Sequence, residues 1–342
     1  MAEPSGHGAG FRDILLVELL GGIGDLLMFL PVVHALARRH RQARIRVLTH
    51  DPGAELLRDD PAVSDVRAPA RRGAEREAVA AALAEHAPDL AVTTTRFAGI
   101  PDLLAGGATR AVTDLWRRPP GDELVTARYL RILHAEGLIG ADELPARPRL
   151  PLAAERAGAG RRLLAGCLPP RPRGAPVLLV PDAGMAVKRW PDRSWTQLAA
   201  ALTRRGHPVL ATAAPGPVPT LPRVDLPQLA GILAAVAAAG GVVVGGDTGP
   251  VRLAAAVGAP TVALFGPTLA SRYGLGAGRQ LQGLAGCPHR RGTSITEQVC
   301  WWDAACPLRP AGPACMADIT VEEVTAAVLG AVAEPGDGRT IP

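Results

Sequence analysis

The sequence predicts an α/β protein with two domains, each built on a parallel β-sheet. Short apolar runs rich in Val, Leu and Ile alternate with longer segments of helical period that are rich in Ala, Leu and Arg, which is typical of repeated βαβ units. The apolar runs are continuous rather than alternating, so the strands should be buried on both faces. A length of 342 residues suits two domains of ordinary size.

The alternation of elements is interrupted by the proline-rich stretch Leu168–Pro176. Prolines stiffen a connection and resist helix formation, so this stretch is the expected linker. Before it we expect strands at Ile14–Leu19, Ile45–Thr49, Val63–Arg67, Leu90–Thr94 and Arg110–Val112, with helices at Asp25–Arg39, Ala74–Glu85, Ile100–Ala105 and Asp122–Glu136. After it we expect strands at Val177–Val180, Val209–Thr212, Val242–Gly245 and Thr261–Phe265, with helices at Trp195–Arg204, Leu226–Ala239, Val251–Val257 and Val321–Val332.

This pattern gives a first domain over residues 11–167 and a second over residues 176–320. The last helix follows Thr320, which with Glu323 makes a capping box. Residues 321–333 are then a separate C-terminal helix that could pack back on the first domain. We expect the two domains to face each other across a cleft, with ligands bound beyond the carboxyl ends of the strands.

The composition excludes several classes of protein. Only 3% of the residues are aromatic, too few for stacking platforms that bind single-stranded nucleic acid. The formal net charge of +5 comes with scattered arginines and favours an anionic small molecule rather than nucleic acid. The first ten residues lack the apolar core of a signal peptide, and no stretch approaches the roughly 20 apolar residues of a membrane helix. A cytoplasmic protein with reduced cysteines is therefore expected.

Lys188 is the only lysine in the chain, and the other 36 of the 37 lysine and arginine residues are arginines. A compact ammonium can fit against a phosphate oxygen where a planar guanidinium cannot. Lys188 is either a chance survivor on a solvated loop or a cation that a binding site requires.

The first motif is a buried strand followed by a turn with Gly21, Gly22 and Gly24. The turn leads to Asp25 at the start of a helix. Its spacing does not match the dinucleotide pattern G-x-G-x-x-G, which argues against a nicotinamide enzyme. Asp25 can be a helix cap or a carboxylate that points into the cleft.

Three further motifs follow strands of the second half. Lys188-Arg-Trp-Pro191 comes after the strand at Val177–Val180, and Asp247-Thr-Gly-Pro250 directly follows a buried strand. The free amides of the helix that starts there, with the Thr248 hydroxyl, would form an anion site suited to a diphosphate. Gly266-Pro-Thr268 follows the next strand. Asp247-Thr-Gly249 is also the aspartic-protease tripeptide, but a second copy of it, which such a protease needs, is absent.

These motifs, in this order, resemble glycosyltransferase family 9, the heptosyltransferase family. The resemblance rests on Gly24-Asp25 with Pro31, Lys188 to Pro191, Asp247–Ala254 and Phe265–Thr268, and it extends over roughly residues 14–332. It implies a GT-B fold, with two Rossmann-like domains, the acceptor bound by the first and a nucleotide-diphosphate sugar by the second.

The resemblance also implies roles for individual residues. Asp25 would be the general base, and Lys188 a cation on the donor phosphates. The donor site would further include Gly24, Asp247, Thr248, Gly249, Pro250, Arg252, Gly266, Pro267 and Thr268. No metal or other cofactor is implied, since Asp-x-Asp, the usual metal clamp of the other glycosyltransferase fold, does not occur. The expected reaction is an inverting, metal-independent transfer of a heptose or related sugar from an ADP-, GDP- or other nucleotide sugar to a hydroxyl group.

The chain departs from the family pattern at three places. Arg252 stands where the family usually has His, Glu18 stands near a position often occupied by Arg, and an expected ribose-binding Glu has no counterpart in Ala213–Pro219. The nucleotide, the sugar and the acceptor, a glycolipid such as lipopolysaccharide core or a natural product such as an antibiotic, therefore stay open. Two alternatives are a non-hydrolysing nucleotide-sugar epimerase and a non-catalytic paralogue that binds sugar nucleotides.

Four cysteines, Cys287, Cys300, Cys306 and Cys315, lie within thirty residues of one another. Four thiols so placed can hold zinc, although no pair has the usual C-x₂₋₄-C spacing. Reduced thiols in a loop are the simpler expectation.

Overall fold

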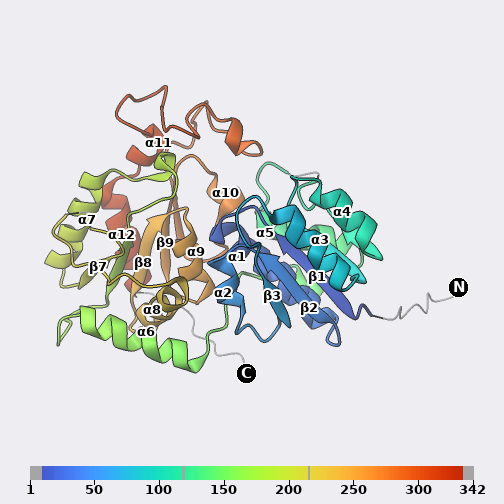
Figure 1. Cartoon of the computed structure of the whole chain (residues 1–342). Helices are drawn as coiled ribbons and strands as arrows, with labels where there is room; N and C mark the ends of the chain where they lie inside the picture. The colour runs from blue at the N-terminus through green and yellow to red at the C-terminus, as the bar shows by residue number, and fades with distance from the viewer. Residues whose placement is uncertain (1–9, 118–119, 215, 334–342) are drawn as a thin grey trace, which may run out of the picture. The chain divides into compact units, whose positions relative to one another are not determined.

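The structure is a computed structural model that describes residues 10–117, 120–214 and 216–333. The described residues divide into two compact units. The first contains the chain up to residue 117 together with Thr126–Arg147, and the second contains Pro120–Val125 together with the chain from Pro148 onward. Figure 1 labels most of the elements of both.

The first unit is built on a five-stranded parallel sheet in the order β3-β2-β1-β4-β5. Its strands are β1 (Asp13–Glu18), β2 (Arg44–Thr49), β3 (Asp65–Arg67), β4 (Leu90–Thr93) and β5 (Arg110–Val112). All six residues of β1 are buried, as expected for the central strand of a sheet that is covered on both faces.

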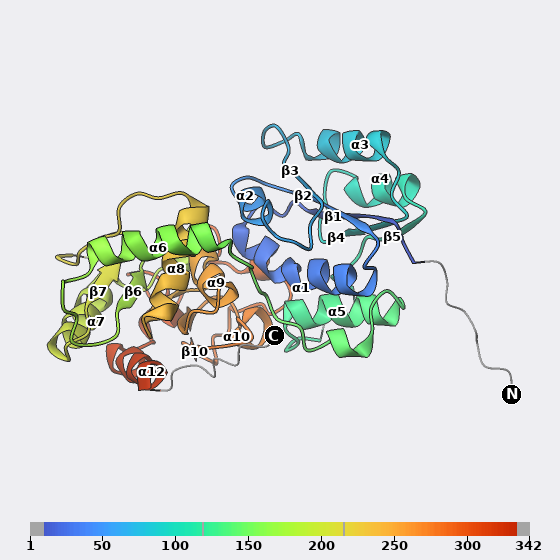
Figure 2. The same ribbon diagram turned by 90° about the horizontal axis from the view of Figure 1, so that it is seen from below.

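Helices cover both faces of this sheet, with α3 and α4 on one side and α1 and α5 on the other (Figure 2). Leu15 and Val17 of β1 pack with Val79 of α3 and Ile100 of α4 in one buried cluster. The helices are α1 (Ile23–Arg39), α2 (Gly53–Leu57), α3 (Glu75–Glu85), α4 (Ile100–Gly107) and α5 (Val125–Ala135), followed by the 3₁₀ turn η1 (Ala141–Glu143).

The second unit repeats this plan with a five-stranded parallel sheet in the order β10-β9-β8-β6-β7. Its strands are β6 (Val177–Val180), β7 (Val209–Ala211), β8 (Val242–Gly246), β9 (Thr261–Phe265) and β10 (Arg279–Gln282). Its helices are α6 (Ala154–Cys167), α7 (Asp192–Arg204), α8 (Leu226–Ala238), α9 (Gly249–Ala256), α10 (Ala270–Tyr273), α11 (Ala314–Ala317) and α12 (Val321–Ala333), with 3₁₀ turns η2 (Ala186–Lys188) and η3 (Ile295–Glu297).

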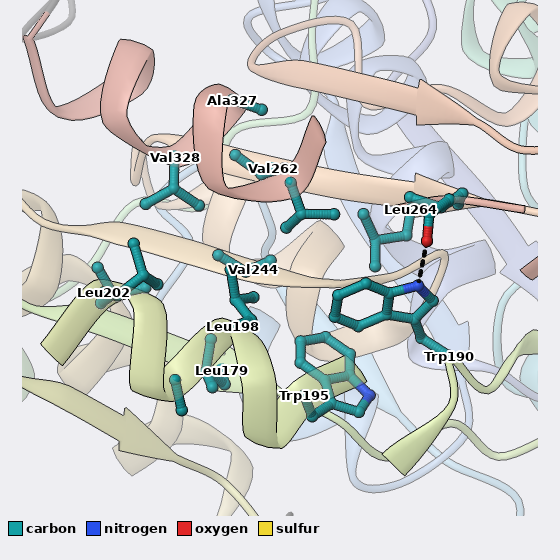
Figure 3. Close-up of a cluster of buried hydrophobic side chains, with 14 of the residues drawn as sticks. Leu179, Trp190, Trp195, Leu198, Leu202, Val244, Val262, Leu264, Ala327 and Val328 are labelled. Atoms are coloured by element: carbon teal, nitrogen blue, oxygen red, sulfur yellow. Dashed lines mark hydrogen bonds between the residues drawn. The ribbon is translucent and has the colours of Figure 1, made fainter. Parts of the chain in front are cut away.

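Two tryptophans anchor one face of the second sheet (Figure 3). Trp190 and Trp195 meet edge to face with ring centroids 4.9 Å apart, and they pack with side chains of β6, β8, β9, α7 and α12. The Trp190 Nε1–H donates to the Ile319 carbonyl at 2.9 Å. The segment that carries Lys188 is thereby fixed to the core two residues further on.

The boundary between the units lies earlier than the sequence led us to expect. We expected the first domain to run to Cys167, but α6 packs against α8 within the second unit (Figure 2). Gly160 of α6 and Gly231 of α8 touch so closely that a Cβ built on Gly160 would overlap the backbone of Gly231. The stretch Leu168–Pro176 is therefore a loop inside the second unit rather than a link between units.

The C-terminal helix also differs from the expectation. Residues 321–333 could have packed back on the first domain, but Val324 and Val328 of α12 lie in the core of the second unit. The expected capping box is confirmed, since the Glu323 N–H donates to the Thr320 hydroxyl at 3.2 Å and the Thr320 N–H donates to the Glu323 carboxylate at 2.8 Å. None of the described helices is long and apolar enough to cross a membrane.

Candidate functional site

The carboxyl ends of β6, β8 and β9 bring three of the sequence motifs together in the second unit. The strands are hydrogen-bonded neighbours, so the segments that follow them meet at one edge of the sheet. Lys188, Asp247 and Thr268 come from these three segments, and Lys188 and Thr268 both donate to the Asp247 carboxylate.

Lys188 lies at the end of the η2 turn with its side chain directed to Asp247. Its Nζ donates to the Asp247 Oδ2 at 2.8 Å and to the Asp247 backbone carbonyl at 3.1 Å. The ammonium also lies 5.6 Å from the centroid of the Trp301 ring, a cation–π distance. The Lys188 side chain keeps 19% of its surface exposed, so solvent or a ligand can reach it.

Asp247 is buried, and its carboxylate is shared by two cations. Besides Lys188, Arg252 of α9 donates to its Oδ1, and the Thr268 hydroxyl donates to its Oδ2 at 2.9 Å. Burial opposes ionisation of Asp247, but the charges of Arg252 and Lys188 outweigh it and hold the pKa of this carboxyl well below its usual range. Two cations and one carboxylate leave this network with a net positive charge, which suits an anionic ligand.

Arg252 is itself buried, and its guanidinium donates to the Asp247 carboxylate and to the Tyr273 carbonyl. Both of these hydrogen bonds are internal to the protein. The family resemblance places Arg252 in the donor site, and in the structure its guanidinium holds Asp247. Contact between Arg252 and the donor stays a prediction.

Thr248 is the N-cap of α9, where the helix begins with Gly249 and Pro250. Its side chain makes no capping hydrogen bond, and its Oγ1 is buried without a partner. A buried hydroxyl without a partner costs free energy. The orphan hydroxyl and the free N–H groups of the first turn are together suited to a phosphate.

The segment after β9 closes this edge of the sheet. Gly266, Pro267 and Thr268 are all buried, and the Gly266 carbonyl accepts a hydrogen bond from Arg290 Nε at 2.9 Å. A Cβ built on Gly266 would collide with the Met316 side chain. A larger residue here would therefore require the Met316 side chain to move.

A hollow of about 420 Å³ lies at the end of the neighbouring strand β7. It is lined by Thr212, Thr220, Leu221 and Arg223, among others. None of the residues that line this hollow was predicted to be functional, because Thr212 and Thr220 belong to no recognisable motif.

In the first unit, Gly24 and Asp25 lie in the first turn of α1. Asp25 is half-buried, and its backbone N–H donates to the Gly22 carbonyl at 3.0 Å. A Cβ built on Gly22 would lie 3.0 Å from the Asp25 Oδ2, so the carboxyl folds back over the glycine turn. The helix has Gly22, not Asp25, as its N-cap, and the cap makes no side-chain hydrogen bond.

Glu18 is a residue of this turn whose importance the sequence analysis missed. It ends β1, is only 1% exposed, and accepts hydrogen bonds from the Leu20 N–H at 3.0 Å and the Thr49 hydroxyl at 3.5 Å. Burial, and after it the charge of Asp25, raises the pKa of Glu18 to about 8. A carboxyl group directly after the apolar run Ile14–Val17, at the end of a buried strand, was the signal that could have revealed it.

The four clustered cysteines and Cys167 are all free thiols. Cys300 packs with Val187 and Trp301, beside Lys188. Burial raises the pKa of the Cys315 thiol to about 11. In the part of the chain that the structure describes, no group of cysteine, histidine or acidic side chains is arranged to hold a metal ion.

Comparison with known proteins decides the family. The model described as "Glycosyltransferase family 9 (heptosyltransferase)" matches residues 117–286. The expected family is confirmed. The matched residues contain Lys188, Asp247 and Thr268, and this match, together with the heptosyltransferase structures below, indicates a glycosyltransferase. No curated protein sequence matches the chain.

Solved structures of bacterial glycosyltransferases have the same fold. The E. coli ADP-heptose LPS heptosyltransferase II has 19% sequence identity and a TM-score of 0.69, over 94% of this chain and 98% of that one. The E. coli heptosyltransferase WaaC with ADP has 17% identity and a TM-score of 0.62, over 94% and 100%. TibC, an iron-containing dodecameric glycosyltransferase of E. coli, has 17% identity and a TM-score of 0.63, over 96% and 78%. The GT-B fold of this family 9 chain is therefore confirmed.

Proposed function

We propose that this chain is an inverting glycosyltransferase that moves a heptose or related sugar from a nucleotide-diphosphate donor to a hydroxyl group. The donor's diphosphate binds at the carboxyl edge of the second sheet, around Lys188 and Thr248. The acceptor binds to the first unit, where Asp25 accepts the proton of its hydroxyl.

The unused hydrogen-bonding capacity around Asp247 carries this proposal. An ammonium has three donors, and two from Lys188 meet Asp247 oxygens. No protein acceptor for the third is found among the described residues, and the hydroxyl of Thr248, the residue after Asp247, is also without a partner. A phosphate oxygen would satisfy both groups.

In the proposed reaction, Asp25 removes the hydroxyl proton as the acceptor oxygen attacks the anomeric carbon. The bond from that carbon to the diphosphate breaks, and its electron pair leaves with the diphosphate. Lys188 and the amides at the start of α9 then stabilise the charge that develops on the leaving group. The related protein TibC is described as iron-containing. The related protein WaaC is described in a structure with ADP. We propose an ADP- or GDP-sugar donor and a reaction that needs no metal.

The donor is identified by a thermal-shift panel of ADP-, GDP-, UDP- and dTDP-sugars, because a ligand that binds the folded state raises Tm. The selected nucleotide sugar is then incubated with glycolipid and natural-product hydroxyl acceptors, with and without EDTA. We expect transfer that depends on the acceptor and survives EDTA. Turnover of the nucleotide sugar alone would support an epimerase, and binding without turnover would support a non-catalytic paralogue.

Asp25→Ala tests the base in the same assay. We expect kcat to fall by about 10²–10⁴, the usual contribution of a general base, with donor affinity little changed. Near-normal turnover of this variant would mean that Asp25 only shapes the turn.

A further inference from the structure

Two neighbouring tryptophans of the second unit have opposite environments. They lie in the segment between β10 and α11, where Trp301 is only 5% exposed and Trp302 is 75% exposed. The Trp302 Nε1–H donates to the Thr296 carbonyl at 3.2 Å, while Trp301 packs with Val187 and Cys300. Val187 is the residue before Lys188, so this packing joins the Trp301 side chain to the turn that carries the lysine.

The backbone around Trp301 is folded into short turns that fix its place. The Trp301 N–H donates to the Gln298 carbonyl at 3.0 Å, and the Ala304 N–H donates to the Cys300 carbonyl at 3.0 Å. Gln298 is itself buried, and its side-chain amide donates to the Ile295 carbonyl at 2.9 Å. Ile295 and Ala304 also pack against the cluster that contains Trp301. The ring is therefore held by the protein.

The Trp301 ring is the second neighbour of the Lys188 ammonium, after Asp247. The Nζ lies 5.6 Å from the ring centroid, and tryptophan is the aromatic side chain that attracts a cation most strongly. Among the described residues, Asp247 is the only acid that contacts Lys188. A carboxylate in the place of the ring would cancel the charge of the ammonium, whereas the neutral ring attracts the ammonium and leaves its charge in place.

We propose that Trp301 is a positioning residue for Lys188, whose ring fixes the ammonium at the proposed diphosphate site. The proposal rests on the function proposed above and concerns the same site. The lysine stem is flexible, and a cation that is placed before the ligand arrives loses less freedom on binding. The ring also keeps water away from one side of the ammonium, which strengthens the attraction of the ammonium for an anion.

The test uses Lys188 as its own probe. Because it is the only lysine, labelling the full-length protein with [¹³C]lysine gives one set of side-chain NMR signals. The ring current of an indole face shifts nearby protons upfield, so the methylene protons next to Nζ should lie upfield of their usual position. We expect Trp301→Leu to abolish this shift and Trp301→Phe to keep part of it. Trp302→Leu, the same change at the exposed neighbour, is the matched control and should keep all of it.

Titration with inorganic pyrophosphate, followed through the same signals, measures the affinity of the diphosphate site. We expect Trp301→Leu to raise Kd by about 2- to 30-fold, the range that corresponds to a cation–π contact, and Trp301→Phe to raise it less. Trp302→Leu should bind as the natural chain does. Tm values measured on all three variants confirm folding.

A purely structural role for Trp301 would follow the size of the side chain, so a second arm changes the ring while nearly keeping its size. All five tryptophans are replaced biosynthetically with a fluorinated tryptophan, whose ring face attracts cations less. This replacement should raise the Kd for pyrophosphate in the natural chain but not in Trp301→Phe, since Lys188 faces no other tryptophan among the described residues.

Two results would overturn the proposal: Lys188 signals that are the same in Trp301→Leu and the natural chain, or an effect of fluorination that is equal in the natural chain and Trp301→Phe. A natural chain whose Lys188 signals do not respond to pyrophosphate would instead contradict the proposed function. In that case the upfield shift would still report on the contact between Lys188 and Trp301.

Discussion

Lys188 is held by contacts that an arginine could not reproduce. Its Nζ lies 2.8 Å and 3.1 Å from two oxygens of one residue, Asp247, and faces the Trp301 ring. A guanidinium is wider and planar, so it would carry the same charge to a different place.

Lys188→Arg should therefore lose most of its activity, and Lys188→Ala should lose more. If the contact of Lys188 with the diphosphate is stronger in the transition state than in the ground state, the loss should appear in kcat. If the contact is equally strong in both states, the loss should appear in KM. Steady-state kinetics on both variants, with Tm measured to confirm folding, provides the test. A fully active Lys188→Arg would make the lysine a chance survivor.

Glu18 also gives the protein's stability a defined pH dependence. Burial, followed by the charge of Asp25, raises the pKa of Glu18 from an ordinary 4.5 to about 8 in the folded state. Between these values the folded state holds a proton that the unfolded state releases. The free energy of unfolding should fall as pH rises from 4.5 to 8, by at most about 5 kcal/mol.

Urea denaturation of the natural chain and Glu18→Gln across this range measures that effect. The stability that depends on the Glu18 proton is complete below pH 4.5 and absent above pH 8. Between these values, the free energy of unfolding of Glu18→Gln should therefore increase steadily relative to that of the natural chain. A difference that stays constant with pH would contradict the raised pKa.

At the scale of elements, strands were easier to predict than helix packing. The strands at Val177–Val180 and Thr261–Phe265 are where the sequence predicts them, because continuous apolar runs mark strands buried on both faces. The edge strand β10, whose residues are only half-buried, gave no such signal and was missed. α6 was missed because its only large apolar residues are Leu163 and Leu164, and it packs in the second unit through a glycine contact with α8.

The close contact between Gly160 and Gly231 can be tested by adding one methyl group at Gly160. Gly160→Ala should destabilise the protein, since the added Cβ meets the backbone of α8 and overpacking typically costs about 1–3 kcal/mol. Gly166→Ala is the matched control on the same helix, where nothing lies within 4 Å of the new Cβ. Alanine is the better helix former, so this control should be neutral or stabilising by about 0.5–1 kcal/mol. Equal Tm values for the two variants would contradict the close α6–α8 contact.

At the scale of the whole molecule, the two halves of the chain repeat one plan with different side chains at the strand ends. After the central strand of the first sheet come two carboxyl groups, Glu18 and Asp25, and the second sheet ends in a cationic network around Asp247. The ordered motifs predicted the family and most of these residues. They could not predict that Arg252 points inward to Asp247 or that Thr248 is left without a partner, because both depend on side-chain placement rather than spacing.

The central claim, that the second unit binds the donor's diphosphate at Lys188 and Thr248, is tested most directly by isothermal titration calorimetry. The nucleoside diphosphate selected by the thermal-shift panel is titrated into the natural chain, Thr248→Val and Thr203→Val, the last being an exposed threonine on α7. We predict that Thr248→Val weakens binding by about 5- to 30-fold, as for a lost hydrogen bond of about 1–2 kcal/mol. Thr203→Val should bind as the natural chain does. Unchanged affinity in Thr248→Val would contradict the account and move the diphosphate to another part of the molecule.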